Sequence, residues 1–199
     1  MQKLDHHAYP ASPWKNGGGV TRQVLISPQG ASLDDFDFRI SIADVGSDGP
    51  FSRFDGVDRH LLVLSGAGIA LETPQGEIRL DCASAPYAFA GETPIRSRLP
   101  DGRITDFNVM TRRGRATQTV RQFQLHGQLT LKGDGLPWLL LLAEGQALQA
   151  RNAHGQTASL SRLDALLLTN PDELTLNGNG CRVIVAELKP ATAPNGDAA

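Results

Sequence analysis

Arginine side chains on segments of alternating polarity are the residues of this sequence best suited to chemistry. Arg39 and Ser41 lie on one face of the segment 36–42, whose apolar residues lie on the other face, and Arg59 alternates with Leu61 in the next apolar segment. A guanidinium holds a carboxylate through two parallel hydrogen bonds, and burying a guanidinium without an anion is costly. Arg39 and Arg59 therefore predict a site for the carboxylate of a small molecule. The alternative is that Arg59 forms a structural ion pair with Asp58, Asp106 or Asp44.

A third segment, 104–110, adds polar groups on the face that strand alternation gives to Asp106, Asn108 and Met110. If the three segments are neighbouring strands, this face continues the one that carries the two arginines. We expect Asn108, together with Ser41, to hydrogen-bond the remainder of the ligand. We expect Asp106 and Met110 to line the same pocket.

The stretch 13–19 places Trp14, Lys15 and Asn16 directly before three consecutive glycines. Glycine runs cost backbone entropy, so they are retained where a chain turns sharply or where a ligand or another strand lies against bare peptide. We therefore add these three side chains to the predicted site, with Trp14 or Tyr87 capping the pocket. The alternatives are a closely packed loop, and core positions for both aromatic side chains.

Short apolar segments separated by Gly, Pro, Asn and Asp predict an all-β chain with few helices. The second half repeats the first at an offset of 79 residues (145 − 66), because the run 60–66 matches 139–145 and the run 103–110 matches 182–189. No gap is needed across this span. The pattern therefore predicts two tandem copies of one strand unit.

Each predicted copy has the strand and turn order of a small jelly roll and resembles the cupins. Two copies would make a bicupin, with two tandem barrels of the RmlC-like kind. We predict an N-terminal cupin domain at 1–113 that carries the glycine stretch, a degenerate C-terminal cupin domain at 114–190, and a disordered tail at 191–199. The basic run 112–115 is expected to be a solvated linker, with a nucleic-acid contact as the alternative.

The metal-binding pattern of cupin enzymes, two His and one Glu before the Gly turn and a later His, does not occur here. Arg59 stands at the Glu position, no His occurs in 51–55, and Trp138 stands at the equivalent position of the second copy. None of the five histidines has the spacing of metal ligands. No nucleophile elbow, P-loop or dinucleotide fingerprint occurs either. We therefore predict no metal, no cofactor and no catalytic residue.

Composition gives the chain no electrostatic preference for nucleic acid or an anionic membrane, because 19 Lys and Arg stand against 21 Asp and Glu for a net charge of −2. No apolar run is long enough to span a bilayer, and the N-terminal residues lack the apolar core of an export signal. Cys82 and Cys181 are expected to be small core residues in a reducing compartment. We therefore expect a cytoplasmic protein without nucleic-acid or membrane partners.

Several of these segments are similar to the motifs of the bacterial HutD/Ves family. The resemblance is carried by Pro13–Thr21, Arg39–Ala43, Asp48–Arg59 and Asp106–Met110, and it continues as a pattern to about Leu188. It implies a bicupin fold, a link to histidine utilisation for the HutD branch and a link to stress response for the Ves branch. HutD-type proteins are thought to be non-enzymatic governors that bind a pathway metabolite such as urocanate or a formylated glutamate. Both ligands are small carboxylates, which suits the two arginines, and we favour the HutD branch.

The sequence therefore predicts a metal-free protein that binds a small carboxylate of histidine breakdown and modulates that pathway. One alternative is a metal-independent isomerase or hydrolase of the same metabolite, with Asp106 or His60 as acid or base. Another is a protein–protein module whose barrel is only a scaffold, and a third is a Ves-like role in stress response. A homodimer is compatible with the sequence.

Overall fold

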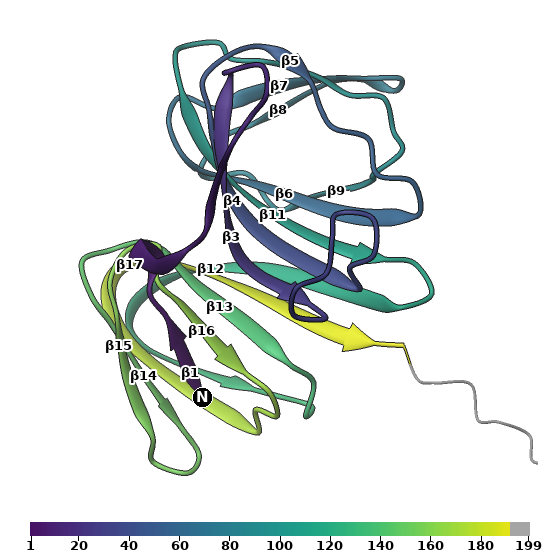
Figure 1. Cartoon of the computed structure of the whole chain (residues 1–199). Coiled ribbons are helices and arrows are strands. Elements are labelled where there is room, and N and C mark those ends of the chain that lie inside the picture. The colour runs from purple at the N-terminus through teal and green to yellow at the C-terminus, as the bar shows by residue number, and fades with distance from the viewer. Residues whose placement is uncertain (192–199) are drawn as a thin grey trace, which may run out of the picture.

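The three-dimensional structure is a computed structural model that describes residues 1–191. Antiparallel strands form three sheets, and the one helical element among the described residues is the 3₁₀ turn η1 (His6–Ala8). The N-terminal half lies above the C-terminal half in Figure 1. No helix within this part of the chain has the length and hydropathy needed to cross a membrane. The predicted disordered tail, apart from Ala191, lies outside the described residues.

The N-terminal half contains a six-stranded and a four-stranded sheet. The six-stranded sheet has the order β2 (Ala11–Pro13), β3 (Gly19–Ser27), β4 (Phe38–Val45), β11 (Ile104–Arg112), β6 (Val57–Ser65) and β9 (Tyr87–Ala90). The four-stranded sheet has the order β5 (Gly49–Pro50), β10 (Arg96–Arg98), β7 (Ile69–Thr73) and β8 (Gly76–Leu80). Apolar side chains from both sheets share one buried cluster, which includes Leu61, Val63, Ile69 and Leu71. The two sheets therefore enclose a common interior.

The C-terminal half is built on a single seven-stranded sheet. Its order is β1 (Gln2–Leu4), β16 (Ala165–Leu168), β13 (Trp138–Glu144), β17 (Glu173–Pro190), β14 (Leu148–Asn152) and β15 (Thr157–Leu160), and β12 (Ala116–Lys132) also pairs with β17. The first strand of the chain is thus an exception to the predicted division at residue 113, because β1 pairs with β16. The sequence pattern carries no signal for this long-range pairing.

The 79-residue repeat is visible in the strand pairing. Ala70 pairs with Arg98 and Leu71 with Ser97 in the N-terminal half, and the residues 79 positions later, Gln149 with Asn177 and Ala150 with Leu176, pair in the same way. The pairing of β6 with β9 and that of β13 with β16 are related by the same offset, since Arg59 pairs with Phe89 and Trp138 pairs with Leu168. The two halves therefore share strand order and much of their register.

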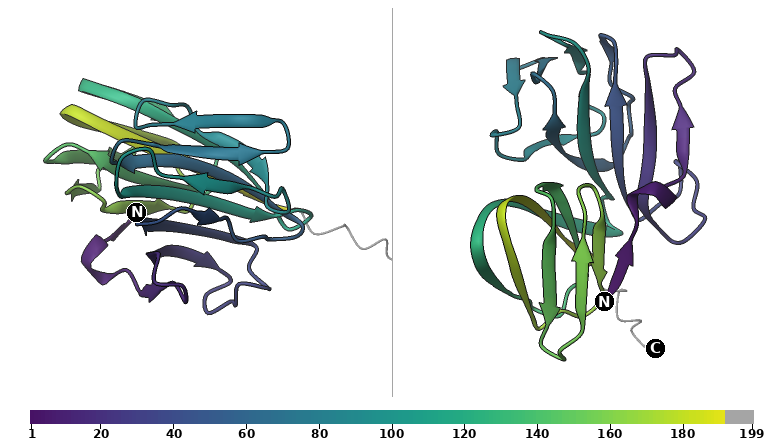
Figure 2. Two further views of the ribbon diagram at one scale, coloured as in Figure 1. Left: turned by 90° about the horizontal axis from the view of Figure 1, so that it is seen from above. Right: turned by 90° about the vertical axis from the view of Figure 1, so that its left-hand side faces the viewer.

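Strand alternation divides the side chains of the six-stranded sheet between two environments. Ile40, Ile42, Leu62, Phe107 and Val109 face the C-terminal half and pack there against Leu139, Leu141, Ile184 and Ala186. The two sheets lie one above the other in the right-hand view of Figure 2. The opposite face of the six-stranded sheet lines the interior of the N-terminal half. This face carries the predicted site.

The basic run at the junction of the halves is largely exposed, and its guanidinium groups are bonded to other groups of the chain. Arg112 Nε donates to the carbonyl oxygen of Phe36, and Arg113 forms an ion pair with Asp58 at 2.6 Å. Arg115 lies 2.9 Å from the Asp35 carboxylate. Arg113 and Arg115 are nevertheless 40% and 48% exposed, as expected of a solvated stretch. Because these guanidinium groups are paired within the chain, the run also lacks the free cations of a nucleic-acid contact.

Candidate functional site

The predicted polar side chains are brought together by the register of β4, β11 and β6. Arg39 pairs with Met110, which pairs with Arg59, so the two arginines flank one methionine across three neighbouring strands. One step along the same face, Ser41 pairs with Asn108. Two of the expected clusters, on 36–42 and on 104–110, thus form one continuous surface. The local cause is strand alternation, which gives all of these positions to the interior face.

Arg59 is held in a buried and largely aromatic setting, and it is 5% exposed. Its Nε and one terminal nitrogen donate to Asn108 Oδ1 at 3.2 and 3.1 Å, and the other terminal nitrogen donates to the Ser52 carbonyl at 3.1 Å. The guanidinium carbon lies between 4.9 and 5.5 Å from the ring centroids of Phe51, Phe54 and Phe89. Burial lowers the pKa of Arg59 to about 10, so the group is cationic at neutral pH.

The expected structural ion pair of Arg59 does not form within the described residues. Asp58 is paired with Arg113, and Asp44 is paired with Arg22. Asp106 forms no ion pair with a guanidinium, and its Oδ1 has no hydrogen-bond partner among these residues. The reason is strand alternation, which gives Asp58 and Asp44 to the opposite face of their strands. Three hydrogen bonds of Arg59 to protein groups leave two of its five N–H donors for a ligand.

Arg39 is the second cation on this face, and it is half-buried. Its Nε lies 3.4 Å from Gln23 Oε1, and one terminal nitrogen lies 3.9 Å from Met110 Sδ. Burial lowers the pKa of Arg39, and the charge of Arg39 contributes to the lowered pKa of Arg59. No carboxylate of residues 1–191 pairs with either arginine, so this face concentrates positive charge that an anion would neutralise.

Asp106 is the acidic group of the interior face. Its side chain is 3% exposed, and its Oδ1 has no hydrogen-bond partner among the described residues. Burial raises the pKa of Asp106 to about 7, although the attraction of Arg59 opposes this shift. A carboxyl with such a pKa exchanges its proton near neutral pH, and a buried oxygen without a partner is costly unless something binds to it.

The glycine stretch lies at the other end of the sheet from the arginines. Gly19 pairs with Val45, six residues beyond Arg39 on β4 (45 − 39), which is about 20 Å along an extended strand. Lys15 and Asn16 are exposed, and Asn16 Oδ1 accepts a hydrogen bond from the Gly18 N–H. The structure therefore does not bring these two side chains to the arginines.

Close packing explains Gly18 and Gly19, whereas Gly17 has open space around it and a left-handed backbone with a φ of 72°. A Cβ at Gly19 would lie 2.5 Å from the Asp44 carbonyl oxygen and 3.0 Å from the Trp14 ring, and one at Gly18 would lie 2.4 Å from Ser47 Oγ. Trp14 donates from Nε1 to Thr21 Oγ1 at 2.8 Å and packs against the interior apolar cluster. The alternative of a closely packed loop thus describes this segment.

Tyr87 lies on β9, two residues before Phe89. Within the described part of the chain, it makes no hydrogen bond to the Arg59 guanidinium. Its ring stacks on Phe89 at 5.6 Å between centroids, and Phe89 in turn covers Arg59. Sequence reasoning missed Phe51, Phe54 and Phe89, whose rings surround the Arg59 guanidinium. Phe51 and Phe54 lie just before β6 and flank the polar pair Ser52 and Arg53. This cluster of aromatic residues close to Arg59 in the sequence was the signal that could have indicated the aromatic walls.

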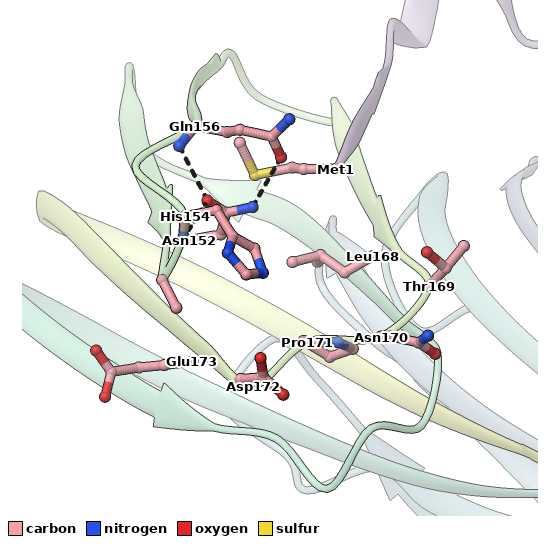
Figure 3. A pocket seen from close by; sticks show the side chains of 11 residues that line it. Met1, Asn152, His154, Gln156, Leu168, Thr169, Asn170, Pro171, Asp172 and Glu173 are labelled. Atoms are coloured by element: carbon pink, nitrogen blue, oxygen red, sulfur yellow. Dashed lines mark hydrogen bonds between the residues drawn. The ribbon is translucent and has the colours of Figure 1, made fainter.

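Two other groups of polar residues lie in the C-terminal half or at its border. A pocket of about 170 Å³ at the end of that half is lined by Asn152, His154, Gln156 and Glu173 (Figure 3). Asn152 accepts from the Gln156 N–H and donates to Gln156 Oε1, so these amides satisfy one another. We assign no ligand to this pocket.

The ligand-type atoms of Asp5, His6 and His7 lie within 4.8 Å of one another. Two of these atoms have other partners, since His6 Nδ1 lies 2.9 Å from Asp164 Oδ1 and Asp5 Oδ1 accepts from the His7 N–H. These contacts fasten η1 to the C-terminal half. The group is separate from the interior face that carries Arg59.

Comparisons with known proteins bear on the whole chain. The HutD family model matches residues 6–185. An uncharacterised 21.2 kDa protein in the hutC 3′ region of Pseudomonas putida is 33% identical over 174 residues, which are 87% of this chain and 90% of that protein. Protein Ves of Citrobacter koseri is 34% identical over 122 residues, which are 61% of this chain and 63% of Ves.

Solved structures are also similar to this chain over nearly its whole length. HutD from Pseudomonas fluorescens SBW25, described as a formate condition, has a TM-score of 0.82 at 26% identity and covers 96% of this chain and 99% of its own. A cupin 2 conserved barrel domain protein from Leptotrichia buccalis has a TM-score of 0.60 at 8% identity, covering 94% of this chain and 96% of its own. The second likeness concerns the fold alone and confirms that the all-β fold is cupin-like.

Proposed function

The chain belongs to the HutD family, as its motifs indicated, and from this premise we propose that it binds a small carboxylate between Arg39 and Arg59. One observation carries the proposal: two guanidinium groups lie on one interior face, on either side of Met110. Among the described residues, no carboxylate is bonded to either of them. Burying like charges side by side is unfavourable, and a bound anion would offset this cost.

The remaining groups of this face match the other end of such a ligand. Asn108 holds the Arg59 guanidinium through Oδ1 and so fixes the direction of its free N–H groups. Asp106 lies two residues further along β11, with an oxygen that lacks a partner in the described chain. That oxygen would accept an N–H from a ligand such as urocanate or a formylated glutamate. Both molecules place a nitrogen several ångströms from a carboxylate.

The coverage of the relatives supports a role in histidine utilisation more than a role in stress response. The relative in the hutC 3′ region aligns over 87% of this chain, whereas Ves aligns over 61%. We propose a non-enzymatic cytoplasmic protein that modulates the pathway by binding one of its metabolites, either as a monomer or as a homodimer. Binding alone would act by stabilising one state of the protein or by lowering the free metabolite concentration.

We further propose a bicupin division, with one cupin unit at 1–113 and a degenerate one at 114–190. The shared register of β7 with β10 and of β14 with β17 supports it. The interior of the second unit is filled by apolar side chains such as Trp138, Leu140 and Leu166, all 0% exposed. The buried cation of the second unit, Arg182, is paired with Glu144 and donates to the Val63 and Leu64 carbonyls. Among the described residues, the buried or half-buried guanidinium groups without a carboxylate partner that we consider for the ligand, Arg39 and Arg59, thus belong to the first unit, which is why we place the ligand there.

Calorimetric titration with urocanate, formylglutamate, histidine, glutamate and formate tests this proposal. Arg59→Met keeps an unbranched side chain among the aromatic rings but removes the charge, so the best ligand should bind at least tenfold more weakly, since a charge-assisted hydrogen bond contributes about 1.5–3 kcal/mol. Arg151→Ala removes an exposed arginine of the C-terminal half and should leave the affinity unchanged. Equal affinities of folded Arg59→Met and the parent protein would exclude Arg59 from the site.

The pKa of Asp106 favours one alternative, a metal-independent isomerase or hydrolase of the same metabolite. A carboxyl that titrates at about 7 suits general acid–base catalysis at neutral pH. His60, the other candidate acid or base, lies on the opposite face of β6 and cannot assist Asp106. Loss of urocanate absorbance in the presence of the protein, abolished in Asp106→Asn, would establish the enzyme and overturn a purely binding function.

A further inference from the structure

A second pocket of about 360 Å³ lies on the other face of β6, at the border with β12. Its lining consists of eight residues: Asp58, Arg59, His60, Ala88, Phe89, Thr111, Thr117 and Gln118. Side chains alternate along a strand, so His60 and Asp58 point away from the interior face that carries the Arg59 guanidinium. Arg59 and Phe89 also line this pocket, but they pair with each other and alternation directs both side chains to the interior face. The pocket therefore adjoins the proposed carboxylate site and opens on the other face of the same strand.

Three polar atoms at this pocket lack hydrogen-bond partners in the described chain. They are His60 Nδ1, Thr111 Oγ1 and Gln118 Oε1, and they come from three different strands, β6, β11 and β12. Thr111 is 1% exposed, so bulk water does not solvate its hydroxyl. Gln118 donates from Nε2 to the Asp58 carbonyl at 3.1 Å, which fixes the orientation of its amide. Buried polar atoms without partners are rare, and three around one pocket indicate a missing partner.

The electrostatics of the pocket favour an uncharged partner. Burial lowers the pKa of His60, although Asp58 opposes the shift, so the imidazole is neutral at pH 7. The Asp58 carboxylate at the rim is already paired with Arg113 at 2.6 Å. Neither an anion nor a cation would therefore find an unpaired opposite charge. The volume is also many times the share of a single water molecule, about 30 Å³ in the liquid.

We propose that this pocket binds a small uncharged molecule that carries both a hydrogen-bond donor and an acceptor, with a primary carboxamide as the best complement. The amide N–H would donate to Gln118 Oε1, and the amide oxygen would accept from the Thr111 hydroxyl. The neutral imidazole of His60 serves as donor or acceptor according to its tautomer. The pocket would thus be filled independently of the carboxylate site, and nothing in this inference depends on the proposed function.

Titration of the protein with acetamide, followed by the NMR signals of the His60 ring, tests the proposal. Acetamide should shift these signals saturably, and acetone, which has a similar shape but no N–H donor, should not. Thr111→Val removes the buried hydroxyl without changing the shape of the side chain. The variant should melt at a higher temperature than the parent protein in the absence of ligand, and acetamide should no longer shift the His60 signals.

Thr105→Val is the matched control, because Thr105 lies on the same strand and its hydroxyl donates to Asp44 Oδ1 at 3.0 Å. This variant should melt at a lower temperature than the parent and should keep the response to acetamide. The proposal is overturned if acetamide leaves His60 unchanged, if acetone acts equally, or if Thr111→Val responds like the parent. A crystal soaked in acetamide that holds only water in this pocket would also overturn it.

Discussion

Replacing Asp106 by Asn should make the protein more stable at high pH and leave it almost unchanged at low pH. The side chain is 3% exposed, and burial raises its pKa from an ordinary value near 3.8 to about 7. Between these two pH values the native state binds more protons than the unfolded state, so the free energy of unfolding falls as the pH rises through this range. Asn resembles the protonated acid in shape and does not ionise.

The size of the effect follows from the two pKa values. A difference of about three units at 1.36 kcal/mol each gives an upper limit of about 4 kcal/mol for the gain at pH 8. In a chain of this length 1 kcal/mol corresponds to about 2–4 °C in melting temperature, so the variant should melt on the order of 10 °C higher at pH 8. At pH 4 the two melting temperatures should nearly coincide.

Scanning calorimetry from pH 4 to pH 9, at constant ionic strength and in buffers without carboxylates, measures this difference. Asp101→Asn removes an exposed carboxylate from a turn of the same half and should give a small difference that does not vary through neutral pH. If the difference between Asp106→Asn and the parent protein does not change with pH, Asp106 titrates normally. The inference from its burial and unpartnered oxygen is then refuted.

Two further substitutions test the packing. Gly19→Ala would place a Cβ 2.5 Å from the Asp44 carbonyl oxygen, and urea denaturation should show a loss of about 1–3 kcal/mol, whereas Gly49→Ala, with no atom within 4 Å of its Cβ, should be nearly neutral. Leu139→Ala truncates a fully buried side chain between the two halves and should cost about 2–5 kcal/mol in the same assay, whereas Leu33→Ala, at a position 50% exposed, should stay within about 0.5 kcal/mol. A neutral Leu139→Ala would show that the two halves do not stabilise each other.

Much of the fold was predictable because its signals are local. Alternation of apolar and polar residues located most of the strands, and the turn glycines kept the two copies at an offset of 79 residues. The strand predicted at 36–42 nevertheless begins at Phe38, because the fully buried ring of Phe36 packs beside Val57 and Met110 instead of continuing the ladder. Boundaries of this kind depend on packing partners that are distant in sequence.

The candidate site shows the same division. Because side-chain direction repeats every two residues, strand alternation alone placed Arg39 and Ser41 on the same face of their strand. In the same way it placed Asp106, Asn108 and Met110 on the same face of theirs. Alternation also directs Asp58 and Asp44 away from the interior, where they pair with other arginines. Alternation could not say whether Asp106, which shares the interior face, would reach Arg59. The register decided this, because it pairs Asp106 with Val63, four residues beyond Arg59 (63 − 59). The alternative of a structural ion pair for Arg59 is for these reasons not realised among the described residues.

The sequence by itself therefore determined the class of fold, the repeat and the set of polar residues that share the interior face. Only the tertiary structure decided that aromatic rings surround Arg59, that Asp106 keeps an unpaired oxygen, and that the glycine stretch lies about 20 Å along the sheet from Arg39. The physical reason is that strand periodicity is encoded between neighbouring residues. Burial, pairing and pKa are instead set by residues that meet only after the sheets have formed.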